Sequence, residues 1–158
     1  MYGEYTRQEI EDQPRVWKEI LDNPPYIGEV ENKEEIIYFG SGTSYYLALS
    51  LASFTQHYTS IPSRGIPSQE LVFFPETIIT RKPVLYFGIS RSGETSEVVM
   101  AMEKARTLGK GSFISVTTEA KSQLTLKSER VIVFESAKEN SVVMTKSFTS
   151  MLFGVQLG

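Results

Sequence analysis

The sequence predicts an α/β fold, a three-layer α/β/α sandwich around a central, mostly parallel sheet. Short, continuously apolar runs of the kind that form buried strands alternate with longer stretches in which apolar residues have helical spacing. The two longest apolar runs, 35–39 and 83–89, each lead into a loop rich in glycine and hydroxyl residues and then into a helical stretch. Since such units place parallel strands side by side, we expect a ligand at the carboxyl ends of the strands.

The expected elements follow the chain in order. A helical lead-in begins at the capping-box pattern Thr6-Arg7-Gln8-Glu9, is kinked or restarted at Pro14, and ends at Asn23-Pro24-Pro25. Strands are predicted at 35–39, 61–66, 83–89, 112–116 and 130–134. Helices are predicted at 45–58, 96–108 and 148–157, with short helical turns at 68–71 and 122–127. We divide the chain into a lead-in, residues 1–30, and one domain, residues 31–158.

The last predicted helix ends without a polar segment after it. Its apolar positions are Phe148, Met151, Leu152, Val155 and Leu157, and Gly158 follows directly. This pattern predicts a helix that packs against something outside these residues, or a chain that is a fragment.

The composition excludes several classes of protein. A chain of 158 residues with 41% hydrophobic and 22% charged residues is typical of one globular domain. The net charge of −3 gives no general attraction to nucleic acid or an anionic membrane, so any anion must be bound locally. With no cysteine and the single His57, we expect no disulfide, no metal centre and no cofactor. The N-terminus lacks an apolar signal core and no run is long enough to span a membrane, which predicts a cytoplasmic protein.

Two loops carry the chemistry that the sequence offers. They are Gly40-Ser41-Gly42-Thr43-Ser44 and Ser90-Arg91-Ser92-Gly93-Glu94-Thr95. Free backbone N–H groups and the helix dipole receive a phosphate well at a helix N-terminus, and hydroxyl groups supply further donors. Hydrogen bonds to a charged group contribute about 1.5–3 kcal/mol each, which predicts roughly micromolar to millimolar affinity. The alternative is that both loops are glycine-containing turns with Ser and Thr as helix caps.

Other motifs fit the two loops poorly. The first loop begins like a dinucleotide fingerprint, but the bulky Tyr45 stands at the third glycine position. The second loop has P-loop spacing, but Glu94 replaces the lysine that a triphosphate requires. A serine-hydrolase triad needs a histidine near the nucleophile, whereas His57 lies at the far end of its helix and is expected to be a surface or packing residue.

At these positions the sequence resembles the sugar isomerase (SIS) domain family, and in particular the N-terminal SIS repeat of glucosamine-6-phosphate synthase and related amino-sugar-phosphate isomerases and deaminases. That family has a C/S-G-T-S loop, an I-S-x-S-G-E-T loop and an E-x-x-V-x-x-T-K-x-F-T segment. The corresponding stretches here are 41–44, 89–95 and 139–149, and the lead-in Glu9-Ile10-Glu11-Asp12-Gln13-Pro14 resembles the family's E-I-x-E-Q-P helix. The resemblance spans nearly the whole chain and implies a flavodoxin-like sandwich.

The resemblance also implies roles for single residues. The phosphate would be held by Ser44, Ser90, Ser92 and Thr95 with the backbone at Arg91, and the sugar would be touched by Thr43 and Val142. Gly42 is expected to belong to the same substrate-binding site. Arg91 stands where glutamine is common and is expected to add a cation near the phosphate, while Met144 alters one sugar contact. Lys146 is expected to be a solvated helix residue. Glu94 and Glu139 are proton-transfer candidates by type, although Glu94 is expected to cap a helix or order its loop.

The resemblance leaves the catalytic residues unassigned. In the family a glutamate base, a ring-opening histidine and a C-terminal lysine belong to a second, tandem repeat or to a neighbouring subunit. The predicted function is therefore the N-terminal half of an aldose–ketose isomerase or deaminase acting on a hexosamine or hexose 6-phosphate, with a second SIS repeat or a homodimer partner. The alternatives are a phosphosugar-sensing regulatory module without catalysis and the isomerase half of a glutamine-dependent amidotransferase.

Overall fold

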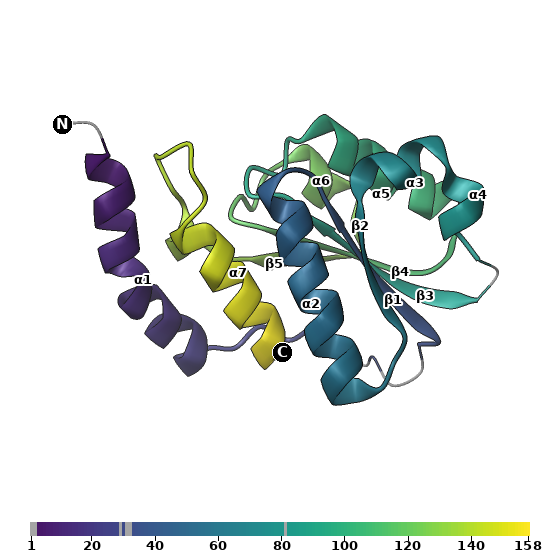
Figure 1. Cartoon of the computed structure of the whole chain (residues 1–158), viewed down its shortest axis with the longest axis horizontal. Coiled ribbons are helices and arrows are strands. Elements are labelled where there is room, and N and C mark those ends of the chain that lie inside the picture. Colours follow the sequence, from purple (N-terminus) through teal and green to yellow (C-terminus); the bar gives the residue numbers. More distant parts are fainter. Residues whose placement is uncertain (1–2, 29, 31–32, 81) are drawn as a thin grey trace.

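The central element is a five-stranded sheet (Figure 1). The computed structural model describes residues 3–28, 30, 33–80 and 82–158. The strand order is β2-β1-β3-β4-β5, and every neighbouring pair is parallel. The strands are β1 (Glu35–Gly40), β2 (Ser63–Pro67), β3 (Pro83–Ile89), β4 (Lys110–Thr117) and β5 (Arg130–Val133). The predicted α/β class with a parallel sheet is confirmed.

Helices cover both faces of the sheet, which makes three layers (Figure 1). One face is covered by α1 (Glu4–Asp22), α2 (Thr43–Thr59) and α7 (Lys146–Leu157). The other face is covered by α3 (Ser68–Phe73), α4 (Pro75–Ile78), α5 (Ser96–Leu108) and α6 (Gln123–Leu126). The short helix α4 and a 3₁₀ turn at Glu135–Ala137 were not predicted from the sequence.

Alternating strand residues build the two halves of the core. In β1, Ile36 and Tyr38 face the layer of α1, α2 and α7, while Ile37 and Phe39 face the opposite layer. Tyr38 stacks on Phe87 of β3, with ring centroids 4.7 Å apart. Because both faces of the strand are buried, its sequence is a continuous apolar run without alternation.

The lead-in forms one helix that continues through Pro14, so the alternative of a restarted second helix is wrong. Proline lacks the N–H that would bond the carbonyl of Ile10. The side-chain amide of Gln13 donates to that carbonyl instead, at 3.3 Å. The helix begins after Gly3, which has a φ of 83°, so Thr6 lies inside the first turn and the predicted capping box does not form the helix start.

The C-terminal helix α7 lies between α1 and α2 (Figure 1). Met151 is fully buried and Val155 is 6% exposed, and both belong to the same core cluster as residues of α1 and α2. A partner for its buried side is therefore present within the chain. These two positions are explained without a partner outside the chain. Sequence reasoning missed the contacts with α1 and α2 because those helices are far from α7 along the chain.

Two further features of the described ranges bear on function. No helix in residues 3–28, 30, 33–80 and 82–158 has the length and apolar content needed to cross a bilayer. Across the same ranges, no three His, Asp or Glu side chains are grouped so that they could hold a metal ion.

Two methionines of α5 test the layer arrangement. Met102 is fully buried beneath the sheet face, whereas Met100 on the same helix is 50% exposed. Met102→Ala should lower the free energy of unfolding by about 2–5 kcal/mol because it leaves a cavity. Met100→Ala, the matched control, should change it by less than about 0.5 kcal/mol. Urea unfolding measures both changes, provided that the free energy of unfolding depends on urea concentration with the same slope in each variant. Equal losses of stability in the two variants would contradict the assigned orientation of α5.

Candidate functional site

The two hydroxyl-rich loops leave neighbouring strands at the same edge of the sheet. β1 pairs with β3 in a register that places Gly40 opposite Ile89, so both strands end at the same level. The first loop leads into α2, of 17 residues, and the second leads into α5, of 13 residues. The N-termini of two long helices are therefore directed to one edge, where their dipoles favour an anion.

The first loop is shaped by glycine. A Cβ on Gly40 would lie 2.6 Å from the backbone of Ser44, and Gly42 has a φ of 55°. Ser44 is 4% exposed, and its hydroxyl lies 4.0 Å from the sulfur of Met144. Thr43 is exposed at the start of α2. Ser41 has a buried hydroxyl that bonds no other group within the described part of the chain, so this loop holds donors that the fold itself does not use.

The second loop is organised around Ser90, which is 1% exposed. Its hydroxyl lies 2.9 Å from that of Thr95 and accepts a bond of 3.1 Å from the amide of Gly93. Gly93 has a φ of 66°, and a Cβ there would collide with the side chain of Ser122. Ser92 is exposed, and its hydroxyl accepts a bond of 3.2 Å from the amide of Glu94. The proton of the Ser92 hydroxyl remains available to a ligand.

Backbone amides add to this set of donors. Within the described residues, the amide groups of Ser92 and Thr95 donate to no protein acceptor. Both lie at the N-terminal side of α5, where unpaired amides point toward the edge of the sheet. Oriented amides of this kind are suited to an anion.

The guanidinium of Arg91 contacts the loop before α7, whereas the sequence predicted a cation beside the phosphate. Its guanidinium donates to the carbonyl of Ser141 at 3.0 Å and lies 3.5 Å from the carboxylate of Glu139. The expected free cation beside the phosphate is therefore engaged with another loop. Sequence reasoning could not show this, because its partners are about 50 residues away and lie outside any strand or helix.

The loop between the 3₁₀ turn and α7 is anchored by the carboxylate of Glu139, whose side chain is completely buried. Burial alone would raise its pKa, but hydrogen bonds from Ser147 and Thr145 outweigh that effect, and the pKa of Glu139 is lowered. The Thr145 amide and hydroxyl donate at 2.7 and 2.8 Å. Val142, at the tip of this loop, is 91% exposed. Glu139 is thus an ionised anchor for the loop.

Lys146 is not the solvated residue that the sequence suggested. Its side chain is only 9% exposed, and its ammonium group lies 3.0 Å from the carboxylate of Asp12 in α1. Arg15, on the next turn of α1, binds the same carboxylate and is the main cause that lowers the pKa of Asp12 to about 2, with Lys146 contributing. The prediction failed because the partner stands 134 residues earlier in the sequence.

Two expectations about single residues are confirmed. The carboxylate of Glu94 accepts a bond of 2.9 Å from the amide of Gln123, which is the first residue of α6. It therefore orders its loop, although it caps α6 and not its own helix. His57 is exposed in the last turn of α2, at the end of the helix opposite the loops.

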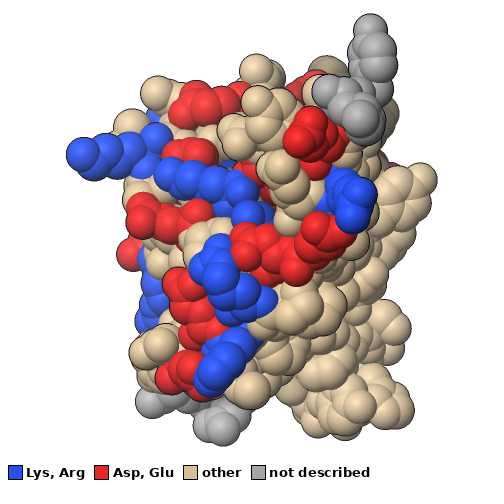
Figure 2. All heavy atoms as spheres, turned by 90° about the vertical axis from the view of Figure 1, so that its left-hand side faces the viewer, with Lys and Arg blue, Asp and Glu red and all other residues tan. Residues whose placement is uncertain are grey.

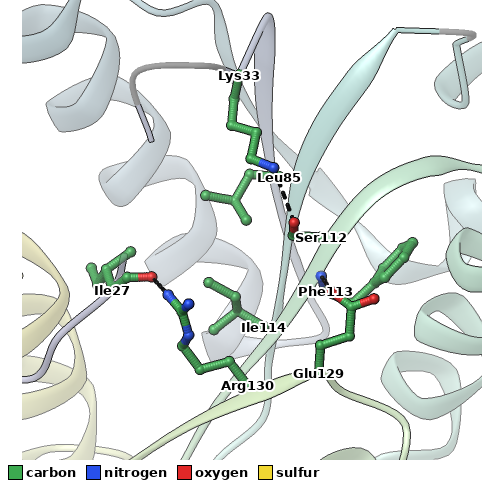
Figure 3. A pocket seen from close by; sticks show the side chains of 8 residues that line it. All are labelled: Ile27, Lys33, Leu85, Ser112, Phe113, Ile114, Glu129 and Arg130. Carbon is green, nitrogen blue, oxygen red and sulfur yellow. Dashed lines mark hydrogen bonds between the residues drawn. The ribbon is translucent and has the colours of Figure 1, made fainter. Parts of the chain in front are cut away.

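A cavity of about 130 Å³ lies at the opposite edge, near the amino ends of β3, β4 and β5 (Figure 3). Its two cations already have partners: Lys33 donates to the hydroxyl of Ser112 at 3.0 Å, and Arg130 donates to the carbonyl of Ile27. Cavities that bind small molecules usually measure about 300 Å³ or more. The size and the engaged cations both argue against a sugar phosphate in this cavity.

Comparison with known proteins identifies the family and the fold. The family model described as SIS domain matches residues 29–157. The glutamine–fructose-6-phosphate aminotransferase of Sulfurisphaera tokodaii is 28% identical over 162 residues, which covers 98% of the chain and 26% of that protein. The same aminotransferase from Staphylococcus aureus is 25% identical, and the match covers 96% of the chain and 27% of that protein. The chain thus spans about a quarter of the length of the curated relatives it matches.

Solved structures share the fold. Glucosamine-6-phosphate deaminase from Thermotoga maritima superposes with a TM-score of 0.83 at 30% identity, covering 97% of the chain and 47% of that structure. The C-terminal domain of the aminotransferase from Francisella tularensis gives a TM-score of 0.86 at 21% identity, covering 99% of the chain and 46% of that structure. At the lower identity the likeness shows the fold alone.

Asp12 predicts a pH dependence of stability. Its folded pKa of about 2 lies below its ordinary value of 3.8, so the ion pair stabilises the fold above pH 3.8 and this stabilisation is lost as pH falls toward 2. Asp12→Asn should be less stable at pH 7, by more than about 1 kcal/mol because it leaves the buried ammonium group of Lys146 without its carboxylate, and should lose less in acid. Urea unfolding between pH 7 and 2 measures this. Asp22→Asn, which removes an exposed pair on the same helix, is the control, and identical acid profiles for wild type and Asp12→Asn would contradict the assignment.

Proposed function

We propose that this chain, which belongs to the SIS domain family, binds the phosphate group of a sugar phosphate between the loop after β1 and the loop after β3. The observation that supports this most directly is the arrangement of the second loop. There the hydroxyls of Ser90 and Thr95 lie 2.9 Å apart beside amides that have no protein acceptor, at the N-terminus of α5. Donors gathered at a helix N-terminus are what a phosphate requires.

The proposed residue roles are those that the resemblance to the family implies. The phosphate is held by hydroxyls and amides of both loops, contributed by Ser44, Ser90, Ser92, Thr95 and the backbone of Arg91, and Gly42 belongs to the same site. The sugar is contacted by Thr43 and Val142, which are both exposed beside these loops. With no lysine in either loop, specificity for the phosphate rests on hydrogen-bond geometry.

The proposed reaction is that of the N-terminal half of an aldose–ketose isomerase or deaminase acting on a hexosamine or hexose 6-phosphate. The Thermotoga maritima deaminase, 30% identical, supports this choice. The aminotransferases among the relatives favour a second candidate, the isomerase half of a glutamine-dependent amidotransferase. Either reaction moves a proton between adjacent carbons and needs a general base.

The two proton-transfer candidates suggested by the sequence, Glu94 and Glu139, are poor candidates for that base. Glu94 accepts from the amide of Gln123, and Glu139 is buried and receives bonds from Thr145 and Ser147. We therefore assign this domain to substrate binding and place the base on a second SIS domain or a second copy. A phosphosugar-sensing module without catalysis fits the same observation.

The surface offers a place for such a partner. Opposite charges gather on the outward side of α1, whereas the right-hand part of the same view, toward α2 and α7, is mostly uncharged (Figure 2). α2 contains no Asp, Glu, Lys or Arg, and it exposes Tyr46 by 64% and Tyr58 by 70%. Exposed apolar surface of this kind fits another protein domain. We propose that a second SIS domain or a second copy covers it, in a cytoplasmic assembly.

Phosphate recognition is tested by calorimetry with glucosamine-6-phosphate, fructose-6-phosphate and the unphosphorylated sugars. Binding should require the phosphate. Ser92→Ala should weaken it about tenfold or more, since a hydrogen bond to a charged group contributes about 1.5–3 kcal/mol. Ser53→Ala, on the exposed side of α2, is the matched control and should bind like wild type. Equal affinity for phosphorylated and unphosphorylated sugar would refute the proposal.

The partner surface is tested by sedimentation of the isolated chain over a range of concentrations. The wild-type chain should self-associate, and Tyr46→Lys should weaken association about tenfold or more, because aromatic side chains carry much of the free energy of such interfaces. Met100→Lys places the same charge on an exposed apolar position of α5, on the other side of the sheet, and serves as the control. A wild-type chain that stays monomeric at high concentration would argue against a second copy as the partner.

A further inference from the structure

We infer that Arg91 is a positioning residue that couples the phosphate loop to the segment 140–145, so that phosphate binding and the placement of Val142 beside the sugar depend on each other. The inference rests on the proposed function of the two loops and deepens it. It gives Arg91 a role different from that of a cation bound to the phosphate. The segment 140–145 is called the cover segment below.

Arg91 is fixed at both of its ends. Its carbonyl accepts bonds from the hydroxyls of Thr117 and Thr118, at 3.0 and 2.9 Å, and from the amide of Thr118 at 3.1 Å. These residues lie at and just after the end of β4. The backbone of the phosphate loop is thereby attached to the sheet, and the guanidinium extends from a fixed point.

At its other end, the guanidinium reaches the cover segment. It donates to the carbonyl of Ser141 at 3.0 Å and lies 3.4 Å from that of Val142. The same nitrogen lies 3.5 Å from the buried carboxylate of Glu139, next to the segment. The side chain is 29% exposed, so these contacts are partly shielded from water.

The other anchors of the cover segment come from elsewhere in the fold. Glu9 of α1 accepts bonds from the amides of Asn140 and Ser141, at 2.6 and 3.1 Å. Glu139 accepts the amide of Thr145 at the far end of the segment. Both ends of the cover segment are thus held by carboxylates, and Arg91 connects it to the phosphate loop.

The exposed tip of the segment is where this connection matters. Val142 is 91% exposed and Val143 is 60% exposed, so neither is held by packing. Their position is set by the backbone contacts on either side, which include the two carbonyls beside Arg91. A ligand that orders the phosphate loop should therefore also order the tip. By thermodynamic linkage, ordering of the tip should favour the ligand to the same extent.

The chemistry of arginine suits this role. The guanidinium is a rigid fork of five donors, and one of its terminal nitrogens donates to the two carbonyls and lies beside the carboxylate of Glu139. A glutamine at the same position has two donors and no charge, so it leaves the carboxylate of Glu139 without its cation. Lysine keeps the charge but loses the fork, and should restore part of the coupling.

The test uses amide hydrogen exchange by NMR and ligand titration on wild type, Arg91→Gln, Arg91→Lys and Arg106→Gln. Arg106 donates to the carbonyl of Lys127 at 2.9 Å, far from the loops, so its variant is the matched control. In ligand-free protein, Arg91→Gln should speed exchange at Asn140, Ser141 and Thr145 about tenfold, whereas Arg106→Gln should not. Saturating inorganic phosphate should slow exchange at these amides in wild type and have no such effect in Arg91→Gln.

Titration separates coupling from direct contact with the phosphate. By linkage, Arg91→Gln should weaken inorganic phosphate by the same factor by which phosphate slows exchange in wild type, and should weaken glucosamine-6-phosphate more, about tenfold, because only the sugar also contacts the tip. Arg91→Lys should lie between wild type and Arg91→Gln. Weaker phosphate binding in Arg91→Gln, together with no effect of phosphate on exchange in wild type, would overturn the inference and make Arg91 a phosphate ligand, and unchanged exchange in ligand-free Arg91→Gln would overturn it as well. Wild type that binds neither ligand would refute the proposed function, while the ligand-free exchange would still report whether Arg91 holds the cover segment.

Discussion

The parallel pairing of β1 with β3 is the constraint on which the site depends. Because Gly40 lies opposite Ile89, the two strands end together and their loops emerge side by side. The close approach of Gly40 to the backbone of Ser44 then brings the start of α2 against the end of its own strand. The N-termini of α2 and α5 therefore lie at the same edge of the sheet, where the dipole of each favours an anion.

A second feature is the number of buried charges that meet around the loop after the 3₁₀ turn. Glu9, Glu139 and Lys146 are all largely buried, and each is paired or hydrogen-bonded to a group distant in sequence. Removing one partner from such a pair costs more than the pair contributes, since it leaves an uncompensated charge. These pairs therefore hold the residues on either side of the exposed Val142 in place, and α1 contributes to this through Glu9.

The charges near the two loops differ in sign and in use. The described residues provide donors for an anion in a chain of net charge −3, so the attraction is local and short in range. Glu94 and Glu139 are engaged in holding the fold. The chain covers 26% of the Sulfurisphaera tokodaii aminotransferase and 47% of the Thermotoga maritima deaminase structure.

The sequence by itself determined the α/β class, the order of strands and helices, and the two hydroxyl-rich loops, because continuous apolar runs, helical spacing and glycine positions are local signals. It also predicted that the side chain of Glu94 orders its loop. Only the tertiary structure decided that α1 runs unbroken through Pro14, that Lys146 pairs with Asp12, and that Arg91 faces Ser141. The two side-chain contacts join residues that are 50 or more positions apart. The unbroken helix depends on the side-chain amide of Gln13, which donates in place of the missing N–H of Pro14. Periodicity along the chain carries no information about such partners.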